Sequence, residues 1–246
     1  MDSKLLQLDR TREICYRNLE QKEGKRARTV IRRINPSRAS TCIGPILPGC
    51  ELFGFCKGQF SLVELIEHCL LEVGPSDLVV STWTAAAADI AHFSMLMQED
   101  FILNARWLLD SSFPERQPEY CDLMLERFGP GSVVCTANHA KFLTITNPDW
   151  SLSVLTSMNL NLNRRLEWYQ ISDDPNIVQL MLDLADACFK DGFTVEATRM
   201  NSDRAYKSVN NIFGKCKTPD RTIYTPAKTT RGQVSFAPAH SKIKFI

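Results

Sequence analysis

Four polar side chains near the middle of the chain have the types and the spacing needed to act on a phosphodiester. His139 and Lys141 are two residues apart in a segment with strand character, and Ser157 and Asn159 are two apart in the next such segment. Residues two apart in a strand point to the same side of a sheet. If the two strands pair through a turn at residues 147–149, an imidazole, an ammonium, a hydroxyl and an amide gather over one patch.

Such a set can cleave a phosphodiester without a metal ion. A neutral imidazole attacks phosphorus, while ammonium and amide donors stabilise the charge on the non-bridging oxygens. On a third strand, Glu167 is placed to accept a hydrogen bond from the other ring nitrogen of His139 and so to fix its tautomer. Arg164 and Arg165 come just before that strand and either contact the substrate or lie on a solvated turn. Each residue alone is more often structural, so the prediction depends on their combination.

The elements that must position these residues alternate between strand and helix, which predicts an α/β fold. Continuous apolar runs indicate strands buried on both faces of a sheet, and an apolar stripe at helical spacing follows a cap near Ser61. The predicted strands are 51–56, 78–83, 105–110, 132–145, 151–159 and 166–171, and the predicted helices after the one at Ser61 are 85–97, 118–128 and 175–191.

The net charge of +1 hides an uneven distribution. Residues 1–40 hold 11 basic and 5 acidic side chains, and residues 201–246 hold 9 and 2, which leaves 9 basic and 21 acidic for the middle of the chain. Basic ends on an acidic body favour contact with a polyanion such as nucleic acid, or else with the acidic body or a partner subunit. We predict a basic N-terminal extension at 1–40, helical from 5 to 33, a linker at 35–48, a central domain at 41–200 and a basic, proline-containing tail at 201–246.

Composition excludes several classes of protein. The chain has 246 residues, of which 44% are hydrophobic and 23% charged, a balance typical of globular domains. No apolar run approaches the roughly 18 residues that cross a bilayer, and the first residues do not resemble a signal peptide. The nine cysteines are scattered, odd in number and without the close pairs of a zinc site. We therefore expect a cytoplasmic protein with no metal, no cofactor and no membrane partner.

The order of the polar residues resembles the phospholipase D superfamily. Its signature reads His-x-Lys, four residues, Asp, and then Gly-Ser-x-Asn on the following strand. This chain offers His139-Ala140-Lys141 and later Thr156-Ser157-Met158-Asn159. Within the superfamily it is most similar to small bacterial endonucleases with a single motif, in which a glutamate at the place of Glu167 supports the histidine. The resemblance covers residues 56–192 and implies a mixed sheet flanked by helices.

The chain departs from the signature at two positions. Thr146 stands where the aspartate belongs, and Thr156 replaces the glycine. The hairpin is also longer than in the signature, because nine residues instead of six lie between positions 146 and 156. Tyrosyl-DNA phosphodiesterases, in the same superfamily, work without that aspartate, so its loss does not imply inactivity. Asp149 is either a substitute acid or a turn former.

A single motif implies a homodimer, because the reaction of this superfamily uses two histidines, one as nucleophile and one as general acid. The resemblance and the basic ends together predict a metal-independent nuclease, with DNA expected in preference to RNA. His139, Lys141, Ser157, Asn159 and Glu167 are the catalytic candidates, and Lys141, Asn159, Arg164 and Arg165 the substrate-binding ones. The alternatives are a degenerate module that binds nucleic acid or serves assembly, and a phospholipid phosphodiesterase.

Overall fold

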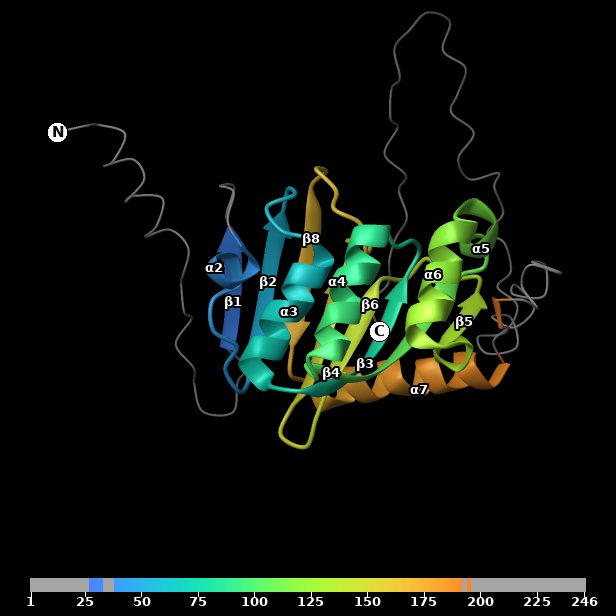
Figure 1. The fold of residues 1–246 in the computed structure, drawn as a ribbon. Helices are drawn as coiled ribbons and strands as arrows, with labels where there is room; N and C mark the ends of the chain where they lie inside the picture. Colours follow the sequence, from blue (N-terminus) through green and yellow to red (C-terminus); the bar gives the residue numbers. More distant parts are fainter. Residues whose placement is uncertain (1–26, 33–37, 192–193, 196–246) are drawn as a thin grey trace, which may run out of the picture. The chain divides into compact units, whose positions relative to one another are not determined.

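An eight-stranded mixed sheet organises the part of the chain that the structure, a computed structural model, describes, namely residues 27–32, 38–191 and 194–195 (Figure 1). The strand order is β1-β2-β8-β7-β6-β3-β4-β5. Parallel pairs at both ends of this order (β1–β2, β3–β4 and β4–β5) enclose a central antiparallel block. The strands are β1 (Ala27–Arg32), β2 (Cys50–Cys56), β3 (Ser76–Thr82), β4 (Ile102–Asp110), β5 (Val133–Thr136), β6 (Phe142–Thr146), β7 (Ser151–Thr156) and β8 (Glu167–Ser172).

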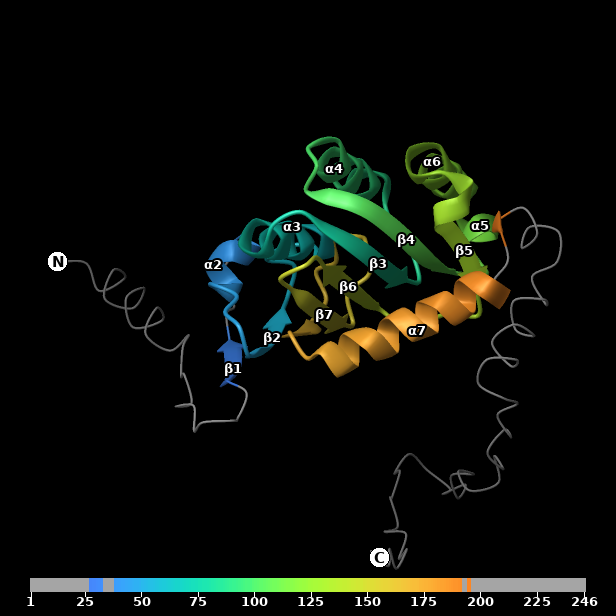
Figure 2. The same cartoon turned by 90° about the horizontal axis from the view of Figure 1, so that it is seen from below.

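Helices cover both faces of the sheet. Helices α3, α4 and α6 lie on one face and α7 lies on the other, as the view in Figure 2 shows. The predicted α/β class, a mixed sheet flanked by helices, is therefore confirmed. The helices are α2 (Ala39–Ile43), α3 (Leu62–Val73), α4 (Ala87–Gln98), α5 (Phe113–Arg116), α6 (Pro118–Phe128) and α7 (Pro175–Asp191), with a short 3₁₀ turn at Pro130–Ser132.

Two cores, one on each face, follow from the alternation of side chains along the strands. In β3, Leu78 and Val80 join the large core beneath α3, α4 and α6, whereas Val79 joins the smaller core beneath α7. The largest fully buried side chain in the large core is Trp107, whose ring lies 4.4 Å from that of Phe93 and 4.8 Å from that of Phe128. Burial on both faces explains why β3 carries three consecutive apolar residues, at positions 78–80, instead of an alternating pattern.

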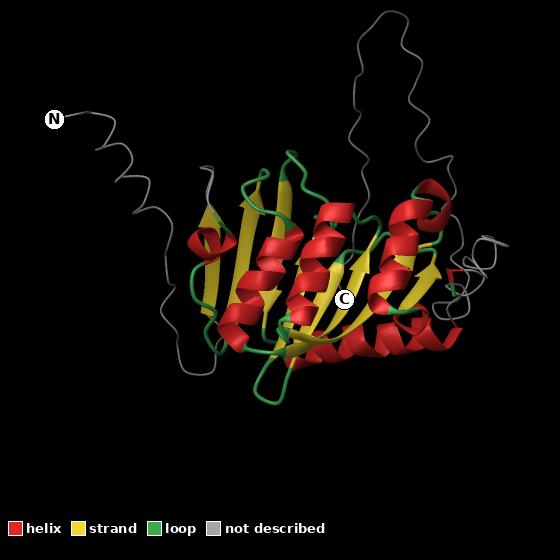
Figure 3. Ribbon diagram, viewed as in Figure 1, coloured by secondary structure: helices red, strands yellow, loops and turns green. Residues whose placement is uncertain are grey.

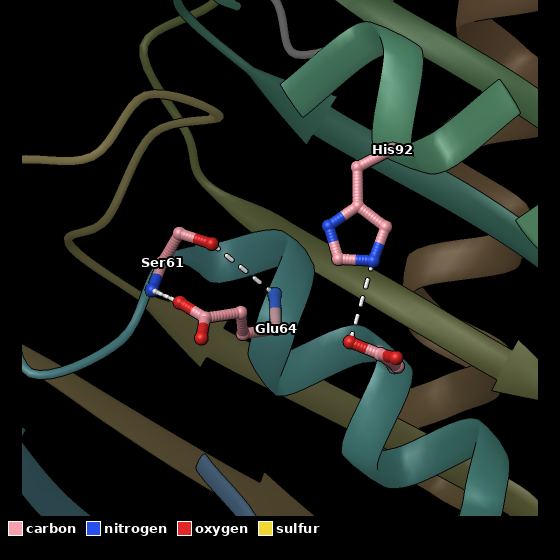
Figure 4. A network of polar contacts seen from close by, with 4 residues as sticks. Ser61, Glu64 and His92 are labelled. Atoms are coloured by element: carbon pink, nitrogen blue, oxygen red, sulfur yellow. Dashed lines mark hydrogen bonds and ion pairs between the residues drawn. The ribbon is translucent and has the colours of Figure 1, made fainter. Parts of the chain in front are cut away.

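Helix α3 begins at a capping box, as the serine at position 61 predicted. The Ser61 side chain accepts a hydrogen bond from the Glu64 N–H at 3.2 Å, and the Glu64 carboxylate accepts one from the Ser61 N–H at 2.7 Å (Figure 4). The two contacts satisfy N–H groups that have no partner within the helix. His92 of α4 lies 3.3 Å from the Glu67 carboxylate and ties α4 to α3.

The directions of the strands bring the strand ends that carry the site to one edge of the sheet, which we call the upper edge. The carboxyl ends of β2, β3, β4, β5 and β7 and the amino ends of β6 and β8 all lie there, because these last two strands run antiparallel to their neighbours. The turn between β6 and β7 lies at the opposite edge (Figure 3). The catalytic and substrate-binding candidates, at positions 139, 141, 157, 159, 164, 165 and 167, all belong to a loop or strand end at the upper edge.

The structure corrects two predicted elements. Residues Ala27–Arg32, predicted as helix within 5–33, form strand β1, which pairs in parallel with β2; the β-branched run Thr29-Val30-Ile31 favours that state. The single strand predicted at 132–145 is divided into β5 and β6 by a loop at 137–141. Strand β5 pairs with β4 while β6 lies between β3 and β7, so the chain must leave the sheet to pass from one position to the other.

The remaining differences concern the ends of the chain. The predicted linker at 35–48 contains the short helix α2. The helix predicted at 5–26 and the basic tail at 201–246 lie outside the described residues, so the division into three regions stays a prediction. None of the helices in the described part is long and apolar enough to span a membrane.

Candidate active site

Strands β6 and β7 form the hairpin on which the site prediction depends. They pair antiparallel, with Phe142 opposite Leu155, and the pairing continues beyond the strands because the Thr156 N–H donates to the Lys141 carbonyl at 3.1 Å. The turn closes through the Asn147 N–H, which donates to the Trp150 carbonyl at 3.0 Å. The predicted pairing through residues 147–149 is confirmed, and it brings Lys141 next to the segment that carries Ser157.

His139 lies in the loop between β5 and β6, not in a strand, and the backbone on both sides of it is held firmly. Asn138 donates to the Ser81 hydroxyl at 2.9 Å, and its amide oxygen accepts the Ala140 N–H at 3.0 Å. The Ser81 hydroxyl in turn donates to the Ala140 carbonyl at 2.9 Å. The imidazole is therefore exposed on a loop whose backbone is anchored to β3.

Lys141 is in contact with His139. Its ammonium donates to the His139 carbonyl at 2.8 Å and lies 3.3 Å from ring nitrogen Nδ1. Partial burial lowers the pKa of Lys141 below its usual range, while the negative charges of Glu167 and Asp110 act in the opposite direction. The ammonium thus holds its proton less tightly than a surface lysine, and the two carboxylates reduce this effect.

Ser157 and Glu167 form a second polar group at the same edge. The Ser157 hydroxyl donates to Glu167 Oε2 and accepts the Trp168 N–H at 3.0 Å. Asn163 donates to the other carboxylate oxygen, Oε1, at 3.3 Å. Within the part of the chain that the structure describes, the carboxylate bonds Ser157 and Asn163 and makes no hydrogen bond to His139, because β8 presents it to the end of β7.

Asn159 carries a buried amide oxygen that has no hydrogen-bond partner among the described residues, and so does Asn161. Buried polar atoms are nearly always paired, so two unpaired amides in one loop are an unusual feature. The loop is fixed nearby, since the Ala86 N–H donates to the Leu160 carbonyl at 2.7 Å. The chain after β7 therefore lies against the chain after β3.

Arg164 and Arg165 are both exposed, and neither guanidinium is bonded to another residue of the described part. Their loop is shaped by Gly58, which has a φ of +72°. A Cβ at that position would lie 2.9 Å from the Asn163 carbonyl oxygen, so only glycine lets the two loops approach this closely. The contact holds two positive charges in solvent at the upper edge.

Three neighbours of the site were not predicted from the sequence. The Trp83 ring lies 5.7 Å from the His139 ring. The Arg116 guanidinium lies over the Trp83 ring, with Cζ 3.8 Å from the ring centre. Arg116 also donates to the Trp83 carbonyl at 3.0 Å. Asp110, the third neighbour, acts on Lys141 through its charge. Their only signal in the sequence is that Trp83 and Asp110 come at the ends of apolar runs.

Thr146, which stands where the signature has its aspartate, lies at the far end of the hairpin from Lys141, whereas Thr156 lies beside Lys141. Thr146 ends β6 and its hydroxyl donates to the Asp77 carbonyl at 3.3 Å. Thr146 is five positions along the chain from Lys141, which in a strand is about 16 Å. Asp149 is a turn residue, because its N–H donates to the Asn147 side chain at 3.0 Å. Neither position 146 nor Asp149 reaches the upper edge.

A cavity of about 600 Å³ lies elsewhere, between α3 and α4. Its lining includes Glu64, Glu67, Asp89 and His92 and none of the predicted site residues. Burial raises the pKa of Asp89, which is 8% exposed, while His92 opposes this and Glu64 adds to it. Among the described residues, no group of three histidine, cysteine or acidic side chains is arranged to hold a metal ion.

Comparisons with known proteins give only distant likenesses. No protein-family model matches the chain, and no curated protein matches its sequence. The solved structures similar to it include Nuc from Salmonella typhimurium, a phospholipase D family member, at 10% identity and a TM-score of 0.45, covering 58% of this chain and 96% of that one. NucT from Helicobacter pylori has 10% identity and a TM-score of 0.45, and the match covers 58% of this chain and 99% of that one. Phosphatidylserine synthase from Haemophilus influenzae has 13% identity and a TM-score of 0.39, and the match covers 66% of this chain and 46% of that one. Likenesses of this size do not establish an activity for the chain.

Proposed function

We propose that the chain is a metal-independent phosphodiesterase that cleaves nucleic acid at the upper edge of the sheet, with His139 as nucleophile. The observation that carries the proposal is the contact between the His139 imidazole and the Lys141 ammonium, 3.3 Å apart. It is supported by the second polar group, Ser157 with Glu167, which the pairing of β6 and β7 brings to the same edge. The negative charges of Glu167 and Asp110 favour the charged form of Lys141, which is the form that an anionic ligand requires.

In the first step a ring nitrogen of His139 attacks phosphorus. Lys141 and the Asn159 amide bind the non-bridging oxygens and stabilise their charge in the transition state. A bound phosphate competes with the imidazole for the Lys141 ammonium, which leaves His139 free to take the tautomer that attack requires. Ser157, held by Glu167, adds a hydroxyl to the same patch. A nitrogen–phosphorus bond forms, and the bond from phosphorus to the leaving oxygen breaks.

The second histidine comes from another copy of the chain. The partner subunit's His139, protonated, gives its proton to the leaving oxygen. Water then attacks the phosphohistidine, that same imidazole takes a proton from the water, and the nitrogen–phosphorus bond breaks. One composite site per homodimer follows, on a two-fold axis, which is the commonest arrangement of a homodimer.

Nucleic acid, and DNA in preference to RNA, is the proposed substrate because of charge. Arg164 and Arg165 stand in solvent beside the site, and the two ends of the chain carry +6 and +7. Positive side chains near a phosphodiester chain release its counterions and raise affinity without sequence preference. The replaced aspartate does not argue against activity, since Thr146 is about 16 Å along the strand from Lys141.

The proposal is tested by cleavage of labelled single- and double-stranded DNA and RNA in excess EDTA. Wild type is compared with His139→Ala and with His92→Ala, a matched histidine whose contact is with Glu67 on α3. We expect cleavage that survives chelation, is lost in His139→Ala and is retained in His92→Ala. Binding without any cleavage by the wild-type protein would instead show a degenerate module that holds the phosphate backbone.

A further inference from the structure

Three aromatic side chains lie side by side on a part of the sheet that α7, the helix described on that face, does not cover. Phe53 and Phe55 of β2 and Trp168 of β8 occupy one face, because Phe55 pairs with Trp168 in register and Phe53 is two residues from Phe55. The Phe53 and Trp168 rings are stacked with centres 6.0 Å apart, and the Phe53 and Phe55 rings meet edge to face at 5.4 Å. We call this set the aromatic platform.

The platform is on the face that α7 covers only in part. Alternate residues of the same strands, such as Leu52 and Tyr169, point into the large core on the other face. Helix α7 packs on β5, β6 and β7, and Figure 2 shows it crossing beneath that part of the sheet. Phe55 and Trp168 remain 43% and 37% exposed, a large fraction for rings in the interior of a sheet.

The platform begins one residue from the proposed site. Trp168 follows Glu167, and its N–H donates to the Ser157 hydroxyl at 3.0 Å. Basic side chains border it at the upper edge, since Lys57 follows the end of β2 while Arg164 and Arg165 come just before β8. Exposed rings beside positive charges and a phosphodiester site are the combination that binds single-stranded nucleic acid, with bases stacked on rings and phosphates paired to cations.

We propose that the aromatic platform stacks the bases of single-stranded nucleic acid and holds the strand against the site at Ser157 and Glu167. This inference rests on the proposed function, and it adds that the substrate is single-stranded in the region next to the scissile bond. In a duplex the faces of the bases are covered by their neighbours, so the rings have nothing to stack on. An unpaired strand presents every base face.

A second copy of the chain fits the platform less well than a base. An aromatic side chain buries about 150–250 Å², so two rings that are about 40% exposed offer roughly 200 Å² together. A stable dimer buries about 800 Å² per partner. Two or three bases match the exposed area of the rings, and the neighbouring cations match the phosphates that accompany those bases.

The test separates stacking from charge. Two labelled 12-mers are compared, oligo(dT) and an abasic oligomer with the same deoxyribose phosphates, using the full chain with His139→Ala so that neither is cut. We expect oligo(dT) to bind at least about tenfold more tightly, which is the contribution of a single stacked base. Trp168→Ala should remove that preference and leave abasic binding unchanged, Trp168→Phe should retain most of it, and Leu180→Ala, an exposed residue of α7, should change neither.

Three results would overturn the inference. Equal binding of both oligomers means that the rings do not contact bases. A Trp168→Ala variant that keeps the thermal melt of wild type and yet weakens both oligomers alike shows that Trp168 does not act by stacking on bases. A fall in molar mass by light scattering in Trp168→Ala shows that the platform joins protomers. Failure of the proposed function is a separate result, seen as absence of His139-dependent cleavage while base-dependent binding persists.

Discussion

Replacing Glu167 by glutamine should weaken the site in a way that can be calculated from its contacts. The carboxylate accepts hydrogen bonds from Ser157 and from Asn163, and its charge raises the pKa of Lys141. A hydrogen bond to a charged group contributes about 1 kcal/mol more than one to a neutral group. Because the site is only half buried, screening reduces the loss from two bonds to about 1 kcal/mol, or 2–4 °C in Tm for a chain of this size.

The same change should shift the titration of Lys141 downward. A nearby carboxylate favours the charged ammonium, so removing it lowers the pKa of Lys141 further below its usual range. The high-pH limb of the cleavage profile then moves to lower pH. A ¹³Cε lysine NMR titration gives the same answer without relying on activity, with the Lys141 signal assigned by its absence in Lys141→Arg. Asp110→Asn should shift it in the same direction.

Glu126→Gln is the matched control, since Glu126 is exposed and its contact is a 3.9 Å approach to Arg127. It should change neither the Tm nor the titration of Lys141. The reasoning is refuted if Glu167→Gln leaves the lysine titration where it was or moves it to higher pH. A large fall in Tm with no change in the titration of Lys141 would mean that Glu167 stabilises the fold and does not act on Lys141.

Three further predictions follow from particular contacts. Ser61→Ala removes the cap of α3 and should cost about 1 kcal/mol, or 2–4 °C in Tm, whereas Ser40→Ala at an exposed position should not. Asp89→Asn should raise the Tm relative to wild type at pH 7, and the gain should shrink as the pH falls toward 4. The reason is that the pKa of Asp89 is raised in the folded protein, so the wild-type protein loses stability as the pH rises from the pKa of a free carboxyl group through the pKa in the folded state. An unchanged difference across that range would contradict the assignment. Wild type co-refolded with an equal amount of His139→Ala should give about a quarter of full activity if both histidines of a dimer are needed, and about half if each chain acts alone.

Local patterns predicted the elements that carry the site. The cap at Ser61, the apolar stripe of α3 that follows it, and the strands on either side of residues 147–149 are each decided by neighbours within a few residues. The hairpin that brings Lys141 beside Thr156 follows from such a pattern, because two strands joined by a short turn lie side by side and pair. The helix at 175–191 has the bounds that the sequence predicted.

Contacts set by the order of strands in the sheet were not predictable in the same way. The loop at 137–141 exists because β5 and β6 occupy separate positions in the sheet, which no local pattern reveals. Trp83 meets His139 across 56 residues of sequence, and the carboxylate of Glu167 turns to Ser157 because β8 pairs with both β7 and β2. The aromatic platform depends on that same β2–β8 pairing.

Capture of the covalent intermediate tests the central claim most directly. Wild-type protein is denatured in the middle of cleavage of a labelled oligonucleotide in EDTA, digested, and searched for a peptide that carries the label. The account predicts an acid-labile, alkali-stable adduct on the peptide that contains His139, and none in His139→Ala. Continued cleavage with the adduct on another residue, or with no adduct at any time, would contradict it.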